Sequence, residues 1–212
     1  MTIPEPPNSP PSDLDPIFTT LKPGTELRRI YKDKDGRTEK TFNYKGPYGR
    51  FDHHRYPIDK PQVEKDRAVA YWGWGDTLSC CLVEIFGDQK FIASQDRAIR
   101  RAALMKLDQP VLLLDLRGNG SMRIGSTAKL AKNGTRKVTQ AWSRYFYDNS
   151  QVFGEIDGLI YFNSHNDENS ICFYERVIPK LEGAIAYSIA LDDPAIQTEI
   201  QQCCIDTSLK YL

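Results

Sequence analysis

The chain has 212 residues and a mass of 24.2 kDa, and its 28 Lys and Arg residues balance its 28 Asp and Glu residues. This length fits one ordinary domain, and the balanced charge gives no basic excess that would indicate direct nucleic-acid binding. The hydrophobic fraction is 40%, the mean hydropathy is -0.51, and no apolar run reaches the roughly 20 residues that span a bilayer, so we expect no membrane association.

The first 20 residues predict a disordered, proline-rich leader, and residues 21–212 predict a single domain. Residues 1–16 contain six of the 13 prolines, and this composition buries too little apolar surface to offset the entropy of ordering the chain. No cationic stretch followed by an apolar one is readable there as a signal peptide, so we expect a cytoplasmic location.

The five cysteines predict free thiols in a reducing compartment. Cys80 and Cys81 are adjacent, Cys203 and Cys204 are adjacent, and Cys172 stands alone. Neither a C-x-x-C nor an H-x-x-x-H spacing occurs, so we expect no metal site.

The first half of the chain predicts two strands, a loop and a helix. Residues 27–31 are interpreted as a short strand before a turn that carries an Asp-Gly pair, where a hairpin or a loop begins. Residues 46–57 are rich in Gly, Pro, His and Arg, which is typical of a functional loop. The uncharged residues 68–74 predict a buried strand, and an amphipathic helix follows, capped by Asp76 or Thr77.

That helix is expected to end at Gly87, and strands and helices then alternate irregularly. The further elements are a charged helix over 95–106, a buried strand over 111–116, a helix over 135–147, strands over 156–163 and 171–175 with a polar turn between them, and a last helix from Asp193 and Pro194. Because no regular β-α-β repeat is visible, the pattern favours a mixed α+β domain.

A glycine-rich loop follows the predicted buried strand, where a phosphate-binding loop would lie. Gly120 and Gly125 have the spacing of a Walker A loop, and Thr127 matches its hydroxyl, but Ser126 stands where the lysine should be. Arg123 occupies the third glycine position of a dinucleotide fingerprint. We therefore favour a plain strand-to-helix turn and keep a magnesium-dependent nucleotide hydrolase as an alternative.

Arginines beside aromatic residues form a second candidate site. Arg29 lies on the first predicted strand, Tyr48 and Arg50 lie in the polar loop, and Tyr71 lies on the buried strand. Guanidinium groups grip diphosphates, and flat rings stack on a base or a nicotinamide, so the mixture suits a nucleotide. The alternative for each residue taken alone is ordinary packing or a surface ion pair.

Glu84 is a third candidate, because it is the single charged residue between positions 78 and 86. It lies roughly 130° from the centre of the apolar stripe, at about 100° per residue, so packing does not require it. In a largely buried helix, a lone carboxylate needs a hydrogen-bond or charge partner, or has a function. The alternative is a solvated surface glutamate.

The predicted strand over 156–163 leads into a fourth candidate, the polar residues Ser164 and His165. Groups at a strand end can meet a ligand, although a polar turn is the alternative. Adjacent residues face opposite ways when extended, so these two form no Ser-His nucleophile pair by themselves.

In their order and spacing, these short motifs resemble the RES domain family over residues 27–177. The matching segments are 27–31, 49–52, 68–71, 77–86, 114–116, 123–125, 139–142, 157–161, 163–166 and 172–175. The resemblance implies a fold similar to ADP-ribosyltransferases, with a mixed, largely antiparallel sheet core and flanking helices, and a RES-like catalytic domain over 21–212.

The resemblance also implies an NAD-degrading enzyme, the toxin of a toxin-antitoxin pair. Such an enzyme cleaves the nicotinamide-ribose bond and passes the ADP-ribosyl group to phosphate, water or a protein. NAD and inorganic phosphate would then be its small-molecule partners, with NAD as substrate and no metal. A cognate antitoxin with an Xre-like helix-turn-helix would be its protein partner.

By the same resemblance, the site consists of catalytic and NAD-binding residues. The catalytic residues would be Arg29, Glu84 and Ser164, and the NAD-binding residues would be Arg50, Tyr71 and Tyr48. Glu84 would stabilise the oxocarbenium-like cation, as carboxylates do in glycoside cleavage. The alternative is a catalytically weak module of this fold that binds a nucleotide or a protein, because His165 stands where family members often have an arginine after the serine.

Overall fold

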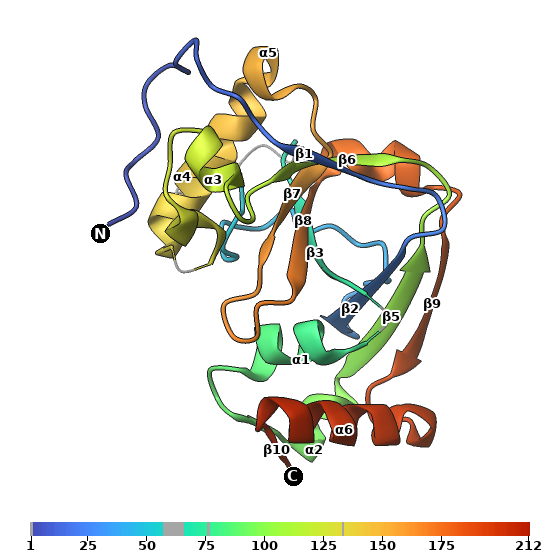
Figure 1. Ribbon diagram of the computed structural model, residues 1–212. Helices are drawn as coiled ribbons and strands as arrows, with labels where there is room; N and C mark the ends of the chain where they lie inside the picture. Colours follow the sequence, from blue (N-terminus) through green and yellow to red (C-terminus); the bar gives the residue numbers. More distant parts are fainter. Residues whose placement is uncertain (1, 57–65, 76, 133) are drawn as a thin grey trace.

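The computed structural model describes residues 2–56, 66–75, 77–132 and 134–212 (Figure 1). In chain order its strands are β1 (Phe18–Leu21), β2 (Glu26–Lys32), β3 (Val69–Trp74), β4 (Phe91–Ile92), β5 (Arg100–Lys106), β6 (Val111–Asp115), β7 (Gly158–Phe162), β8 (Asn169–Tyr174), β9 (Ile185–Ala190) and β10 (Lys210–Tyr211). Its α-helices are α1 (Ser79–Phe86), α2 (Ser94–Ala98), α3 (Gly120–Arg123), α4 (Arg136–Asp148), α5 (Ser150–Phe153) and α6 (Gln197–Thr207). Short 3-10 helices cover Ala128–Ala131, Glu175–Leu181 and Pro194–Ile196.

Within the described ranges, eight strands form one curled sheet in the order β1-β6-β7-β8-β3-β2-β5-β9. Neighbours in this sheet are antiparallel except β6 and β7, which run parallel. Helices flank the sheet: α3, α4 and α5 lie at one end, and α1 and α6 lie together at the other (Figure 1). The predicted mixed α+β fold with a largely antiparallel sheet is therefore confirmed.

The sheet splits between β2 and β3. These strands pair over only two positions, Leu27 with Trp74 and Arg28 with Gly73, whereas β2 pairs with β5 over seven positions. Beyond Arg28, β2 follows β5 and β9, while β3 stays with β7 and β8 (Figure 1). At the far end of β3 the loop before β3 takes the place of β2, because Asn43 and Val69 exchange two backbone hydrogen bonds. Loops beside a sheet often carry functional residues.

The helices form because one face of each is apolar. In α4 the buried face includes Trp142, Tyr145 and Phe146, which pack against β6 and β7. In α1 nearly every side chain is buried, and its apolar residues pack with β2, β5 and α6. This packing fixes α1 across the end of the split in the sheet.

The predicted helix over 95–106 is wrong beyond its first residues. Only α2 is helical there, and β5 begins at Arg100. Successive residues of β5 face opposite sides of the sheet. Ala102 packs toward α1, and Met105 packs in the core on the other side. Pairing with β2 on one edge and β9 on the other overrides the helical preference of the charged residues.

The predicted leader differs from the structure in two respects. Residues 18–20 of the segment belong to β1, which continues to Leu21 and pairs with β6 at an edge of the sheet. Residues 2–16 contain no helix or strand, but they lie against the domain: Trp142 donates a hydrogen bond of 2.8 Å to the carbonyl of Pro4, and Ile3 and Leu14 contact the core beneath α4.

The other predicted elements are found with small shifts at their ends. The turn after β2 leads into a loop rather than a hairpin, because β2 pairs with β5 and β3 instead. The predicted cap Asp76 and residue 57 of the predicted loop lie outside the described residues, and Leu78, without a side-chain cap bond, precedes α1. Gly87 ends α1, and Asp193 caps the last helical segment with an acceptor for the N–H of Ala195.

All five cysteines are buried and free, and burial raises the pKa of each thiol. For Cys80 and Cys203 the pKa rises to about 11. Because the thiolate is the reactive form, we expect iodoacetamide at pH 8 to label the native protein slowly. After denaturation, it should label all five thiols. Mass spectrometry of the labelled protein tests this expectation, and rapid labelling of any native thiol would contradict it.

No helix in the described part of the chain is both long enough and apolar enough to cross a membrane.

Candidate functional site

Two adjoining hollows lie where the sheet splits. The first, here called the inner hollow, has a volume of about 360 Å³ between β3, β7 and α1 and is lined by residues including Tyr71, Glu84 and Tyr161. The second, the outer hollow, has a volume of about 1000 Å³ and extends along β2 and the loop before β3. Both hollows share Ile30, Tyr71 and Ile85, so they form one groove with these three side chains between its two parts.

Glu84 provides the carboxylate of the inner hollow. It retains exposed surface at the mouth, yet its carboxylate accepts a 3.0 Å hydrogen bond from Nδ2 of Asn163. Crowding by protein atoms raises the pKa of Glu84, and the positive charges of Arg50 and His165 oppose that rise. A partly desolvated carboxylate near a cation matches the type of group that stabilises a developing positive charge.

Arg50 lies behind Tyr161 and does not line either hollow. Its guanidinium donates to the carbonyl of Leu130 at 2.8 Å and of Phe162 at 3.3 Å, and its Cζ lies 5.3 Å from the centre of the Tyr161 ring. Burial lowers the pKa of Arg50, while Tyr161 and Glu84 favour its charged form. Arg50 therefore acts on the inner hollow through its field.

Helix α4 holds the loop that carries Arg50. Gln140 Nε2 donates to the carbonyl of Gly49 at 2.8 Å, Ser143 Oγ donates to that of Phe51 at 2.6 Å, and the hydroxyl of Thr139 donates to that of Arg50 itself. All three side chains are buried. Three successive carbonyls of the loop are thus bonded by one helix, which orders the loop.

Tyr71 and Tyr48 meet at Asp52. The hydroxyl of Tyr71 donates to Asp52 at 2.5 Å and accepts from the N–H of Phe51 at 3.0 Å, while the N–H groups of Tyr48 and Gly49 donate to the same carboxylate. Burial, followed by the charge of Asp52, raises the pKa of Tyr71 well above its usual value. The Tyr71 hydroxyl is therefore occupied, and its ring is the part that faces the groove. The Tyr48 ring is 56% exposed at the outer hollow.

Arg29 lines the outer hollow, together with Lys32 and Arg37. Its Nη1 donates to the carbonyls of Glu39 at 2.9 Å and Thr41 at 2.8 Å. Burial, reinforced by the charge of Arg37, lowers the pKa of Arg29 to about 10. Part of the Arg29 guanidinium is thus hydrogen-bonded to backbone carbonyls. With Lys32 and Arg37 beside it, the outer hollow carries an excess of positive charge.

Ser164 lies apart from these residues. It is exposed in the turn between β7 and β8 and lines neither hollow. The structure therefore places Glu84 and Tyr71 at the inner hollow, with Arg50 behind Tyr161, and places Arg29 and Tyr48 at the outer hollow.

Sequence reasoning missed three residues of the site. Asn163 contacts Glu84, Asp52 anchors both tyrosines, and Tyr161 separates Arg50 from the inner hollow. Asn163, Asp52 and Tyr161 all lie within segments that resemble the RES family. The signal that could have found Asn163 is its place next to Ser164, because buried polar side chains need partners. No local signal distinguishes Asp52 or Tyr161.

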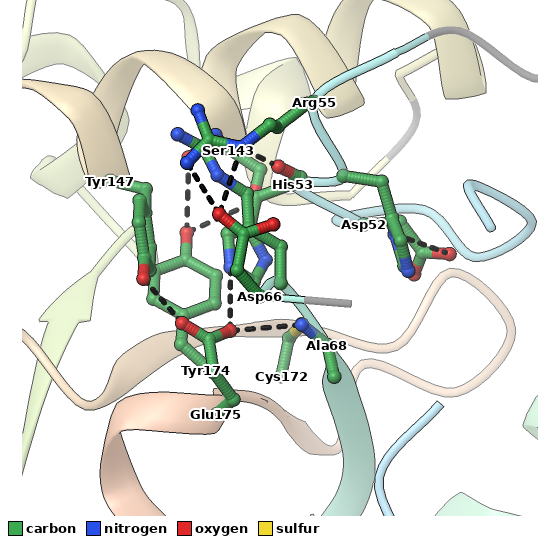
Figure 2. A network of polar contacts seen from close by, with 12 residues as sticks. Asp52, His53, Arg55, Asp66, Ala68, Ser143, Tyr147, Cys172, Tyr174 and Glu175 are labelled. Carbon is green, nitrogen blue, oxygen red and sulfur yellow. Dashed lines mark hydrogen bonds and ion pairs between the residues drawn. The ribbon is translucent and has the colours of Figure 1, made fainter. Parts of the chain in front are cut away.

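A buried polar network lies behind the loop (Figure 2). Glu175 accepts from His53 Nε2 at 2.9 Å, from the N–H of Ala68 at 2.9 Å and from the hydroxyl of Tyr147. The His53 ring lies 4.2 Å from the ring of Tyr174, and His53 Nδ1 has no hydrogen-bond partner in the described part of the chain. The network ties the loop to α4 and to the ends of β3 and β8.

The protonation of this network follows from burial. Burial lowers the pKa of His53, although the hydrogen bond to Glu175 opposes that shift. Burial alone would raise the pKa of Glu175, but the hydrogen bonds from His53, Ala68 and Tyr147 hold it below its usual value. The folded state therefore contains a neutral imidazole beside a carboxylate.

The His53→Phe variant tests this assignment. Because the native state resists protonation of His53, the wild type should lose stability as the pH falls below the unfolded value of about 6.5, by up to about 1.4 kcal/mol per pH unit. Phe keeps the ring contacts but cannot titrate, so the variant should be less stable at pH 7 and show a flatter decline toward pH 5.5. Urea unfolding at both pH values measures this difference, and parallel declines would contradict the assignment.

Comparison with known proteins gives two likenesses. No protein-family model matches the chain. "Probable toxin y4kH" of Sinorhizobium fredii is 30% identical over 79 residues, which are 37% of this chain and 60% of that relative. A chain of the M. tuberculosis MbcT-MbcA toxin-antitoxin complex has the same fold, with a TM-score of 0.58 at 11% identity over 86% of this chain and 92% of that chain.

Proposed function

We propose that the chain is an NAD-degrading enzyme that cleaves the nicotinamide-ribose bond and transfers the ADP-ribosyl group to phosphate or water, and that it is the toxin of a toxin-antitoxin pair. The observation that carries the proposal is the Glu84 carboxylate, bonded to Asn163 in a hollow walled by Tyr71 and Tyr161. The similarity to a relative named as a toxin and the fold shared with a chain of a toxin-antitoxin complex support it.

The groove suits a dinucleotide in one orientation. The nicotinamide and its ribose would occupy the inner hollow, against Tyr71, and the diphosphate would lie at the outer hollow, where Arg29, Lys32 and Arg37 supply positive charge. The exposed ring of Tyr48 would stack on the adenine. Arg50 lines neither hollow and would favour the ionised form of Glu84 through its charge.

Glu84 would act on the bond that breaks. As the bond between ribose C1′ and the nicotinamide nitrogen lengthens, its electron pair moves to the ring nitrogen and nicotinamide leaves as a neutral molecule. The positive charge that develops on the ribose is stabilised by the Glu84 carboxylate. An oxygen of phosphate then bonds to C1′, or a water oxygen does so and releases a proton. Ser164 lines neither hollow, so we assign it no contact with the ribose.

A catalytically weak module that binds a nucleotide or a protein is the second candidate. The observation that favours it is the exposed position of Ser164, which lines neither hollow. In that case the groove would bind its ligand without turnover.

An experiment in cells tests the toxin proposal. Induction of the wild-type chain in a bacterial host should deplete cellular NAD before growth stops, whereas Glu84→Ala, expressed to the same level, should do neither. Growth arrest without a fall in NAD would contradict the NAD-degrading activity. We further propose a cognate antitoxin with an Xre-like helix-turn-helix, and co-expression of such a protein should restore growth and co-purify with the chain.

A further inference from the structure

Asn163 connects the end of β7 to α1. Its side chain is fully buried, and its Nδ2 donates to two oxygen acceptors on α1, the carbonyl of Cys80 at 3.1 Å and Oε2 of Glu84 at 3.0 Å. The same nitrogen also lies 3.7 Å from Sγ of Cys80. Its Oδ1 accepts from the N–H of His165 at 2.8 Å. An amide nitrogen has two hydrogens, and each of them has an acceptor here.

The two acceptors lie one helical turn apart. Residues 80 and 84 are at positions i and i+4 of α1, so they occupy one face of the helix. The amide therefore bridges the backbone of one turn and the carboxylate of the next, which restricts the rotamer of Glu84. A side chain with its surface at the mouth of a hollow would otherwise sample several rotamers.

The bond also discriminates between the two protonation states of Glu84. An N–H donor stabilises a carboxylate, and an amide does so without adding a charge to the hollow. The other charged or titratable groups near Glu84 are Arg50 from the loop, Arg136 from α4, His165 from the β7–β8 turn, Asp88 after α1, Cys80 and Cys81 on α1 and Tyr161 on β7. Among the described residues, Asn163 is the one that donates a hydrogen bond to this carboxylate.

We propose that Asn163 is a positioning residue that fixes the orientation and the ionised form of the Glu84 carboxylate. Its significance for catalysis rests on the proposed function, but the contact itself can be tested without turnover. Asn166 provides a matched control: it lies in the same turn, its Nδ2 donates to Ser79 of α1 at 3.0 Å, and its Oδ1 accepts a backbone N–H, but it has no bond to Glu84.

The test is a titration of the Glu84 carboxyl by carbon-detected NMR, with the resonance assigned from Glu84→Gln. In Asn163→Asp an acceptor replaces the donor, and we expect the Glu84 midpoint to rise by about one pH unit or more. Asn163→Ala should raise it by less, and Asn166→Asp should move it least. A midpoint in Asn163→Asp equal to that in Asn166→Asp would overturn the proposal.

Wild-type protein supplies a second test, which holds even if a variant fails to fold. The side-chain amide protons of Asn163 should shift with the same midpoint as the Glu84 carboxyl, and those of Asn166 should not. If the chemical shifts of the Asn163 amide protons did not change as Glu84 titrates, the proposal would be overturned.

Turnover separates this proposal from the proposed function. If the wild type releases nicotinamide, Asn163→Asp should move the acid limb of the pH-rate profile upward by the same amount as the Glu84 midpoint. An unmoved acid limb would overturn the role of Asn163 in the reaction. A wild type that never releases nicotinamide would overturn the proposed function, while the NMR titration would still decide the contact.

Discussion

Replacement of Glu84 by Gln is expected to lower the rate of nicotinamide release by about 10²- to 10³-fold, the size of effect seen when a group that stabilises charge in a transition state is removed. Gln has nearly the same shape but no charge, so it cannot stabilise the positive ribose. Binding of NAD should change little, because Glu84 acts on charge that develops only during the reaction. Initial rates and equilibrium titration of NAD measure the two effects.

Asp88→Asn is the matched control for this variant. Asp88 follows α1, its side chain is 95% exposed, and its charge raises the pKa of Glu84. The same change from acid to amide should therefore leave the rate close to that of the wild type at neutral pH. Equal losses in both variants, or an unchanged rate in Glu84→Gln, would contradict the role of Glu84.

Arg50→Lys is expected to lower the rate by about 10- to 100-fold, the size of one lost charge-assisted hydrogen bond. Lys keeps the charge but cannot reach the carbonyls of Leu130 and Phe162 with a planar fork, and it loses the stacking on Tyr161. The positive charge at position 50 would lie farther from Glu84, and its field would favour the ionised carboxylate less. The pH-rate profile should show an acid limb at higher pH.

Arg136→Lys is the control for this change. Arg136 is exposed on α4, and its charge also favours ionised Glu84. Its side chain has no hydrogen bond or ion pair with the described residues, so Lys should serve as well. If Arg50→Lys matched the wild type in rate and in pH profile, the fixed geometry of Arg50 would be irrelevant to the site.

Local sequence patterns predicted those elements of the fold that local physics controls. The uncharged run of β3, the apolar run of β6 and the apolar face of α4 each determine one element, and all three are found where expected. β5 was missed because its charged residues favour a helix, and only its two neighbouring strands make it extended. β1 and β9 depend in the same way on distant partners.

The candidate residues of the site could be proposed from the sequence, but their contacts could not. Glu84 is a candidate because it is the one charged residue in an apolar helix. Arg50 and Tyr71 are candidates because they combine an arginine and an aromatic residue in segments that resemble the RES domain family. The contact of Asn163 with Glu84 joins residues 79 positions apart, which no local pattern reveals. The position of Ser164, outside both hollows, likewise follows from the turn between β7 and β8.

Degradation of NAD in the groove is tested most directly by the product that the purified wild-type protein forms. Protein, NAD and either phosphate or a phosphate-free buffer are incubated, and nicotinamide and the mass of the ADP-ribose product are followed. We expect nicotinamide release, with an ADP-ribose phosphate ester in phosphate or free ADP-ribose without it. No nicotinamide release in either buffer, from protein shown to be folded, would contradict the claim.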